Sequence, residues 1–263
     1  MPPQVLAWAR SARRVTVLTG AGMSAESGVP TFRGTRTGLW ARFDPTRLAT
    51  PQAWRADPDL VWAWYLWRIA LVRVVAPNAG HHALACWSQL PGVDLQIATQ
   101  NVDDLHERAG SSVLAHVHGS LEAFRCDTCD RPYDEPVVPT DPPRERAAPP
   151  YCGQCPGRIR PGVVWFGEGL PGAPFEAAVG ACQAADLVLV VGTSGLVHPA
   201  AGLPALARAR GIPVVEVNPQ ESALTDQVDH SWRATAARAL PGLVAALASG
   251  AAGRGPSGPV PSP

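Results

Sequence analysis

Four of the six cysteines form two C-x-x-C pairs, Cys126 with Cys129 and Cys152 with Cys155, and 22 residues separate the pairs. This spacing constrains the fold strongly, because each pair can place two thiolates on one tetrahedral zinc ion. The intervening residues then form a loop of a zinc ribbon. Redox-active pairs are the alternative interpretation. Four thiolates leave no open position on the ion, so the sequence predicts a structural rather than a catalytic zinc.

The chain is long and apolar enough for a sizeable core, with 263 residues of which 46% are hydrophobic. One domain, or a core domain with a smaller inserted module, fits this length. The longest apolar run, Leu60–Trp67, is too short to cross a bilayer, and Met1–Gln4 does not begin a secretory signal. We therefore expect a cytoplasmic protein without a membrane partner, in which paired cysteines bind metal. Cys86 and Cys182 are interpreted as buried core thiols.

The net charge is zero and no basic run occurs, so nothing supports a nucleic-acid partner. All 22 basic residues are arginine, and the chain contains no lysine. Coding bias is the simplest origin of this composition.

Short apolar, β-branched runs alternate with helical segments along the chain. This alternation predicts an α/β fold, a parallel sheet with helices on both faces. An inserted module interrupts it at 119–162, and a Gly, Ala, Pro and Ser tail at 249–263 is expected to be disordered. The predicted strands are 14–19, 94–99, 113–117, 186–191 and 212–217, and the predicted helices are 51–75, 81–89 and 201–210.

A glycine-rich turn follows the first predicted strand, and its sequence, Gly20 to Ala25, fits G-x-G-x-x-G/A. Such turns let a backbone approach a pyrophosphate at a helix N-terminus, although the motif alone is weak. Gly28–Pro30 ends the following helix almost at once, unlike the helix of a dehydrogenase. Residues 31–34 then form a loop that can fold over a cofactor.

Polar side chains follow the next two predicted strands. Gln100, Asn101 and Asp103 come after the second strand, and His118 comes after the third. Carboxyl ends of parallel strands gather ligands, so an amide and an acid there can bind a carboxamide. His118 can act as a general base, since an unperturbed histidine has a pKa of about 6.5. His116 lies inside the strand and is interpreted as structural, but the spacing does not exclude it.

Together these segments resemble the sirtuin family. They follow the order of that family from about residue 10 to residue 245. The resemblance implies a Rossmann-like NAD-binding domain (1–35, 76–118 and 163–248) and a small domain made of a helical module (36–75) and a zinc-ribbon module (119–162). The matching segments are 20–34, 77–81, 99–110, 118–119, the two cysteine pairs, 160–168, 191–194 and 218–219.

The resemblance also implies roles for individual residues. His118 would be catalytic, and the four paired cysteines would hold one zinc. Cofactor binding would involve Gly20, Ala21, Gly22, Ser24 and Glu26 near the pyrophosphate and ribose; Thr31, Phe32, Arg33 and Trp40, of which Phe32 and Arg33 belong to a mobile loop; Gln100, Asn101 and Asp103 at the nicotinamide; Gly192, Thr193, Ser194, Asn218, Pro219 and Gln220 around the adenosine; and Ala236 near the adenine. Val164, Phe166, Gly167 and Glu168 would contact the substrate.

The implied reaction is NAD-dependent deacylation of lysine in protein substrates. The acyl oxygen attacks the ribose carbon that bears nicotinamide, and His118 then acts as general base on the ribose hydroxyls. The ribose 2′-oxygen then attacks the imidate carbon, and water completes the release of free lysine and O-acyl-ADP-ribose, with nicotinamide as the first product. Two departures from the family occur. Ala234 replaces a usual glycine, and His198 stands where many relatives have tyrosine.

A Tyr-x-x-Arg pair indicates which acyl group is removed. Tyr65 and Arg68 share one helix face, where an arginine can also be incidental. The pair resembles the one by which a sirtuin class binds malonyl, succinyl or glutaryl lysine, and Ala49 matches a small residue of that class. We therefore expect desuccinylation or demalonylation besides deacetylation. NAD hydrolysis, ADP-ribosyl transfer and a non-enzymatic zinc-ribbon module are the competing functions.

Overall fold

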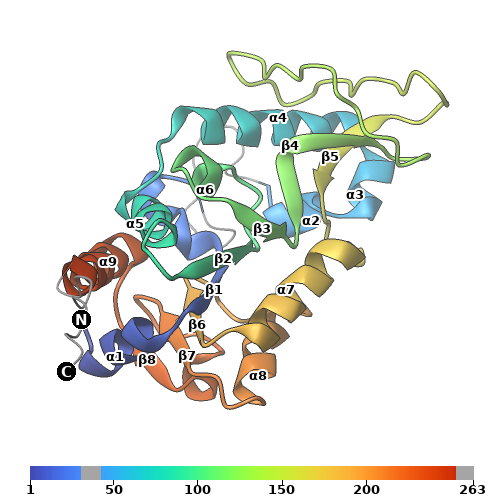
Figure 1. The fold of residues 1–263 in the computed structure, drawn as a ribbon. Helices are drawn as coiled ribbons and strands as arrows, with labels where there is room; N and C mark the ends of the chain where they lie inside the picture. The colour runs from blue at the N-terminus through green and yellow to red at the C-terminus, as the bar shows by residue number, and fades with distance from the viewer. Residues whose placement is uncertain (31–42, 253–263) are drawn as a thin grey trace, which may run out of the picture.

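The computed structural model describes residues 1–30 and 43–252 of the chain. Their centre is a six-stranded, fully parallel sheet in the order β3-β2-β1-β6-β7-β8 (Figure 1). Successive strands move outward in one direction from β1 and in the other from β6, as in a Rossmann-type sheet. The strands are β1 (Arg14–Thr19), β2 (Asp94–Thr99), β3 (Val113–His116), β6 (Leu187–Val191), β7 (Val214–Val217) and β8 (His230–Trp232).

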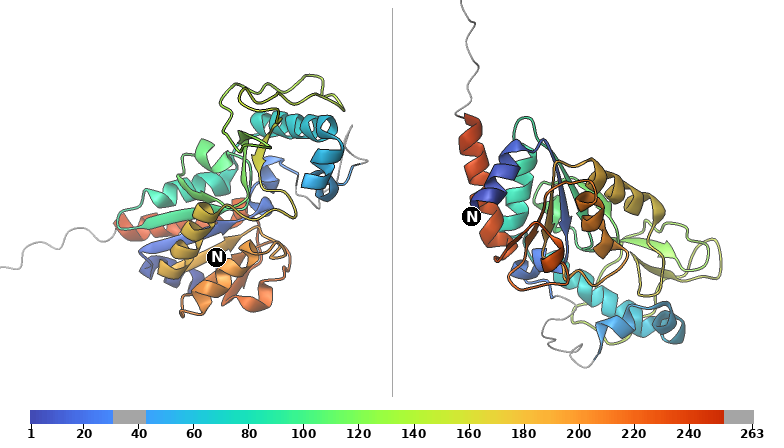
Figure 2. Two further views of the ribbon diagram at one scale, coloured as in Figure 1. Left: turned by 90° about the vertical axis from the view of Figure 1, so that its right-hand side faces the viewer. Right: turned by 90° about the horizontal axis from the view of Figure 1, so that it is seen from below.

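Helices cover both faces of the sheet. One face carries α1 (Pro3–Ser11), α5 (Ala79–Ser88) and α9 (Ala236–Ala252), which Figure 2 shows packed together. The other face carries α7 (Gly172–Ala184) and α8 (Leu203–Arg208). The predicted α/β fold with helices on both faces is therefore confirmed.

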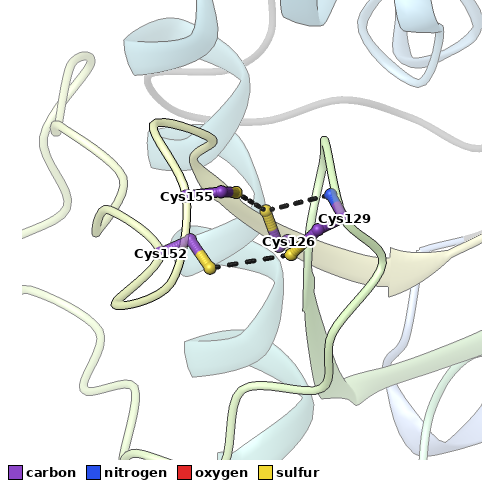
Figure 3. A group of neighbouring side chains, drawn as sticks. All are labelled: Cys126, Cys129, Cys152 and Cys155. Atoms are coloured by element: carbon purple, nitrogen blue, oxygen red, sulfur yellow. Dashed lines mark hydrogen bonds between the residues drawn. The ribbon is translucent and has the colours of Figure 1, made fainter.

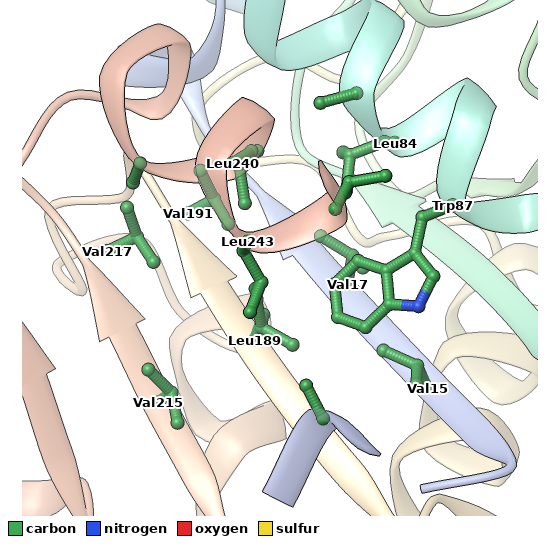
Figure 4. Close-up of a cluster of buried hydrophobic side chains, with 14 of the residues drawn as sticks. Val15, Val17, Leu84, Trp87, Leu189, Val191, Val215, Val217, Leu240 and Leu243 are labelled. Atoms are coloured by element: carbon green, nitrogen blue, oxygen red, sulfur yellow. The ribbon is translucent and has the colours of Figure 1, made fainter. Parts of the chain in front are cut away.

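The alternation of side chains along each strand produces two cores. On β6, Leu187, Leu189 and Val191 point into the core beneath α5 and α9, where Trp87 and Leu243 are fully buried (Figure 4). The intervening valines of the same strand point into the second core, beneath α7 and α8. A strand buried on both faces reads as a continuous apolar run, which is why β6 could be predicted from its sequence.

A third core lies outside the sheet. It joins α2 (Pro45–Leu48), α3 (Pro51–Ala56) and α4 (Pro58–Val74) to an antiparallel pair, β4 (Gly119–Cys126) and β5 (Ile159–Val163). Thr50 caps α3 and Asp57 caps α4, each followed by proline at the first helical position. These caps explain why the predicted helix at 51–75 is two helices with a break at Asp57.

Other predictions need adjustment. Cys86 is exposed on α5 rather than buried, whereas Cys182 is buried as expected. Helix α9 extends to Ala252, four residues into the predicted tail, and the rest of that tail lies outside the described residues. The short α6 (Leu105–Arg108) follows β2.

The described residues contain no single helix that is long and apolar enough to cross a membrane. Helices α4 and α5 satisfy that test only as a pair, and they meet at 70°.

Candidate active site

The polar residues singled out above gather at the carboxyl edge of the sheet. The loops after β1 and β6 meet there, and these neighbouring strands mark the point where the strand order reverses. In open α/β sheets this is where ligands bind. The predicted cofactor residues after β1, β2, β6 and β7 therefore share one edge.

The glycines of the turn are required by backbone contact within the protein. A Cβ on Gly22 would lie 2.7 Å from Gly192 Cα, and one on Gly20 would lie 2.9 Å from Gly192 O. Gly22 N donates to Gly192 O at 2.7 Å, which joins the two loops. The turn continues as two 3-10 turns, Ala21–Met23 and Ala25–Ser27, and ends at Gly28 with φ of 93°. The predicted early stop of the helix at Gly28 is confirmed.

Side chains extend the link across the sheet edge. Gln100 Nε2 donates to Thr193 Oγ1 at 3.3 Å, and Asn218 Nδ2 donates to Thr193 O at 2.9 Å. Residues predicted for the nicotinamide half and for the adenosine half of NAD thus belong to one hydrogen-bonded edge.

Ser24 is the centre of a buried polar network. Asn101 Nδ2 donates to its hydroxyl at 3.1 Å. His81 Nδ1 accepts from the backbone N–H of Asn78, so its Nε2 carries the proton that faces Ser24 Oγ at 3.5 Å. Burial lowers the pKa of His81 to about 4 and raises that of Asp103. His81 is therefore a neutral donor at the site.

His118 is oriented as a base. Its Nδ1 lies 3.1 Å from the backbone oxygen of Gln100. Because a carbonyl oxygen only accepts, Nδ1 carries the proton and Nε2 presents its lone pair. Nε2 is buried, and no polar atom of the described residues pairs with it. Burial lowers the pKa of His118, although the Gln100 bond opposes the shift.

His116 is held in the opposite state. Its Nε2 lies 2.7 Å from Glu107 Oε1 and its Nδ1 lies 3.3 Å from Asn101 O. Burial lowers the pKa of His116, but the bond to Glu107 and its charge outweigh burial and raise the pKa overall. Both ring nitrogens are occupied, so His116 is unsuited to accept a proton from a substrate.

The predicted substrate segment extends from His118 along the end of β5. Val164 N donates to His118 O at 2.8 Å, and Phe166 N donates to Ala49 O at 2.9 Å. Glu168 accepts from the backbone N–H of Trp165 at 2.8 Å and pairs with buried Arg160 at 2.6 Å. The Glu168 carboxylate therefore fixes this segment from within.

The Tyr-x-x-Arg pair of α4 adjoins that segment. The Tyr65 hydroxyl accepts from Trp165 Nε1 at 2.9 Å, and the Arg68 guanidinium lies 5.9 Å from the Tyr65 ring centroid. Burial lowers the pKa of Arg68, whereas the charges of Tyr65 and Asp103 oppose that shift. Ala49 is 4% exposed and belongs to the same core as Tyr65.

The four paired cysteines converge as predicted (Figure 3). Their sulfur atoms lie within 4.8 Å of one another, and Cys126 Sγ is 3.4 Å from Cys155 Sγ while Cys129 Sγ is 3.8 Å from Cys152 Sγ. Tetrahedral zinc with bonds of about 2.3 Å needs sulfur separations of about 3.8 Å. Cys126 Sγ also accepts from the backbone N–H of Cys129, which favours its thiolate. The donor set fits a structural zinc.

Two further predicted cofactor residues, Glu26 and Ala236, lie at the first turn of α9. Glu26 accepts from Ala237 N at 3.2 Å, at the first turn of α9, and Ala236 is buried against Gly80 of α5. Ala234 has no positive φ, so its backbone needs no glycine, and His198 is exposed. Thr31, Phe32, Arg33 and Trp40 lie outside the described residues.

Three residues of the site escaped assignment from the sequence. His81 belongs to a matching segment, and its position three residues after the Asn78 cap was its available signal. Arg160 also stands in a matching segment, and Trp165 resembles an ordinary core aromatic in an apolar run.

Comparison with known proteins agrees with this geometry. The Sir2 family profile matches residues 20–199. An NAD-dependent protein deacylase of Mycolicibacterium paratuberculosis is 54% identical to this chain, and the match covers 89% of this chain and 98% of that protein. An NAD-dependent protein deacylase of Corynebacterium glutamicum is 49% identical, and the match covers 92% of this chain and 94% of that protein.

Two solved structures are similar over nearly the whole chain. A Sir2 homologue in complex with NAD has a TM-score of 0.86 and 42% identity, and covers 95% of each chain. A mutant Sir2 homologue in complex with 2′-O-acetyl ADP ribose has the same TM-score and identity, with 95% of this chain and 98% of that chain covered. By profile, sequence and fold, this chain belongs to the Sir2 family.

Proposed function

We propose that this chain removes carboxylated acyl groups, succinyl and malonyl, from lysine side chains of proteins, at the expense of NAD. The broader activity follows from the family: the chain is an NAD-dependent protein deacylase. Sir2 homologues with 42% identity bind NAD and 2′-O-acetyl ADP ribose, a cofactor and an acylated ADP-ribose, at a fold that this chain shares.

The residues fit the cofactor and the reaction. The sheet edge joins Gly22, Thr193 and Asn218 at the switch point, and neutral His81 and Ser24 support Asn101 beside it. NAD supplies a ribose carbon that the acyl oxygen of the substrate can attack. His118 Nε2, with its free lone pair, is the group positioned to take a proton from a ribose hydroxyl.

The observation that carries the acyl preference is the connection between His118 and the Tyr-x-x-Arg pair. Val164 bonds to the backbone of His118, and the next residue, Trp165, bonds to the Tyr65 hydroxyl. The predicted substrate segment, 164–168, thus leads from His118 to the Tyr65 hydroxyl and, one helical turn further along α4, to the Arg68 guanidinium. Arginine can bind a carboxylate with two hydrogen bonds, and tyrosine can donate a third.

The setting of this pair, a buried tyrosine beside a half-buried arginine, supports the proposal. Tyr65 is 1% exposed, and Arg68 packs against the rings of Trp64 and Tyr65. The electrostatic attraction between a carboxylate and a guanidinium is stronger away from water than at the protein surface. An acetyl group has no carboxylate and leaves this interaction unused.

Arg68→Met tests the proposal. We expect the ratio of kcat/KM for a succinyl-lysine peptide to that for the matching acetyl-lysine peptide to fall about ten- to hundredfold, which corresponds to the loss of a charge-assisted hydrogen-bonded pair. Arg73→Met is the matched control, because Arg73 lies on the same helix and its guanidinium is held by Glu122 at 2.8 Å. Its ratio should stay that of the wild type. Equal losses on both peptides in Arg68→Met would assign Arg68 a structural role.

A further inference from the structure

We infer that Trp165 is a specificity-determining positioning residue: its indole N–H occupies an acceptor position of the Tyr65 hydroxyl, so that Tyr65 presents its own O–H to the distal carboxylate of the acyl chain. This inference rests on the proposed preference for carboxylated acyl groups. It concerns how the site distinguishes an acceptor from a donor, which the Tyr-x-x-Arg spacing alone does not determine.

The hydrogen bond from Trp165 leaves the proton of the Tyr65 hydroxyl available to a second partner. Trp165 Nε1 lies 2.9 Å from Tyr65 Oη, and the two side chains are 2% and 1% exposed. An indole N–H can only donate, so the hydroxyl must accept and its single proton is left for another partner. Among the described residues, the bond from Trp165 is the one hydrogen bond of this hydroxyl. A carboxylate, which only accepts, is the complementary partner.

The protonation state of Tyr65 agrees with a donor role. Burial raises the pKa of Tyr65 to about 12, although Arg68 and the bond from Trp165 oppose this shift. The hydroxyl therefore keeps its proton throughout the neutral range. Without the indole, the hydroxyl can rotate and turn a lone pair toward an incoming carboxylate, which repels it.

Trp165 is itself held rigidly enough to act in this way. The Arg160 guanidinium lies 3.3 Å from the Trp165 ring centroid, and Glu168 accepts from the Trp165 backbone while it pairs with Arg160. The ring of Trp54 packs on it with 5.6 Å between centroids. Since Val164 bonds to His118, the indole also has a fixed position relative to the general base.

Trp165→Phe removes the indole N–H and keeps an aromatic ring. We expect the succinyl-to-acetyl ratio of kcat/KM to fall about three- to tenfold, the range that one hydrogen bond of this kind controls. Trp54→Phe is the matched control from the same aromatic cluster, because its Nε1 donates to Asp127 instead, at 2.8 Å. Its ratio should stay within about twofold of the wild type. A loss confined to Trp165→Phe supports the inference.

A double-mutant cycle separates orientation from packing. In a Tyr65→Phe background there is no hydroxyl to orient, so adding Trp165→Phe should leave the ratio where Tyr65→Phe placed it. A further fall of the same size in that background, or an equal loss on both peptides in Trp165→Phe alone, overturns the inference. If Trp165→Phe does not fold, a benzothienylalanine at position 165 keeps the shape of tryptophan, lacks the N–H, and should lower the ratio equally.

The two proposals fail in different ways. If Arg68→Met leaves the ratio unchanged, the proposed acyl preference is wrong. If Arg68→Met lowers the ratio but Trp165→Phe and the benzothienyl variant do not, the preference stands and the role of Trp165 is refuted.

Discussion

Two histidines, two residues apart, occupy opposite electrostatic environments beside the sheet edge. Burial shifts the pKa of His118 downward despite its bond to the Gln100 carbonyl, whereas the bond to Glu107 outweighs burial at His116 and shifts the pKa of that histidine upward. A general base must be neutral and must have a free lone pair. Of these two histidines, only His118 satisfies both conditions. The sequence alone did not exclude His116.

The pH profile distinguishes the two. Because its folded pKa is lowered, His118 stays neutral to a lower pH than an ordinary histidine. We expect kcat/KM for an acetyl-lysine peptide to rise with pH through a midpoint below about 6.5 and then to level off. The acetyl peptide avoids the titration of a succinyl carboxylate. A midpoint above that value, abolished in His116→Gln, would point to His116 as the base.

Replacing His118 tests the same assignment by loss. We expect His118→Ala to reduce turnover about 10²- to 10⁴-fold, the usual contribution of a general base, while the melting temperature and NAD affinity stay close to the wild type. Calorimetry of NAD binding and circular dichroism provide these controls. Turnover near that of the wild type would exclude His118 as the base.

At the residue scale, the side chains that directly follow strands could be predicted from the sequence. Those whose role depends on a contact with a residue far away in the sequence could not. His118, Asn101 and Asp103 follow strands directly, so their convergence at one edge could be foreseen. Trp165 meets Tyr65 across a sequence separation of 100 residues, and no local pattern reports such a contact. The ion pair of Glu168 with Arg160 likewise becomes visible only when β5 folds.

At the scale of elements, the loop between Cys126 and Cys129 also contacts the helical module. Asp127, between Cys126 and Cys129, accepts from Trp54 of α3, and the Trp54 ring packs on Trp165. The ribbon and the helical module therefore share one core with Tyr65 of the proposed acyl site. Loss of the metal should therefore also disturb the packing of Trp54 and Trp165 in this core.

Zinc removal tests this arrangement. Freshly purified protein should contain about one zinc per chain, and Cys126→Ser or chelation should lower the melting temperature and shift the near-ultraviolet signal of the tryptophans, because zinc ribbons owe much of their folding energy to the metal. Metal analysis and thermal unfolding measure both effects. Folded protein with far less than one zinc would contradict the assignment.

Elements with a clear apolar run or cap were predictable, and those rich in alanine and glycine were not. The bounds of β1 and β2 match the prediction to the residue. Helix α7 reads as a mixture of Ala, Gly and Phe without a sharp period, and α9 contains Pro241, which ordinarily argues against a helix. Their apolar faces become evident only against the sheet that they cover.

At the scale of the whole molecule, the absence of lysine has a chemical consequence. Reactive acyl donors modify lysine amines, and this chain contains no lysine, so that the α-amine at the N-terminus of the protein is the one remaining amine target. We expect prolonged exposure to succinyl-CoA, followed by desalting, to leave activity unchanged and to add at most one succinyl group by intact mass. Adducts at several sites with loss of activity would refute this and direct attention to thiols such as exposed Cys86.

For the whole molecule, our central proposal is that this NAD-dependent protein deacylase transfers a carboxylated acyl group from lysine to ADP-ribose. The most direct measurement incubates the protein with NAD and a succinyl-lysine peptide and follows all products by mass spectrometry. We predict nicotinamide, unmodified peptide and O-succinyl-ADP-ribose in equal amounts, formed faster than the products from an acetyl-lysine peptide at equal concentration. Nicotinamide and free ADP-ribose without peptide deacylation would show NAD hydrolysis instead and would contradict the claim.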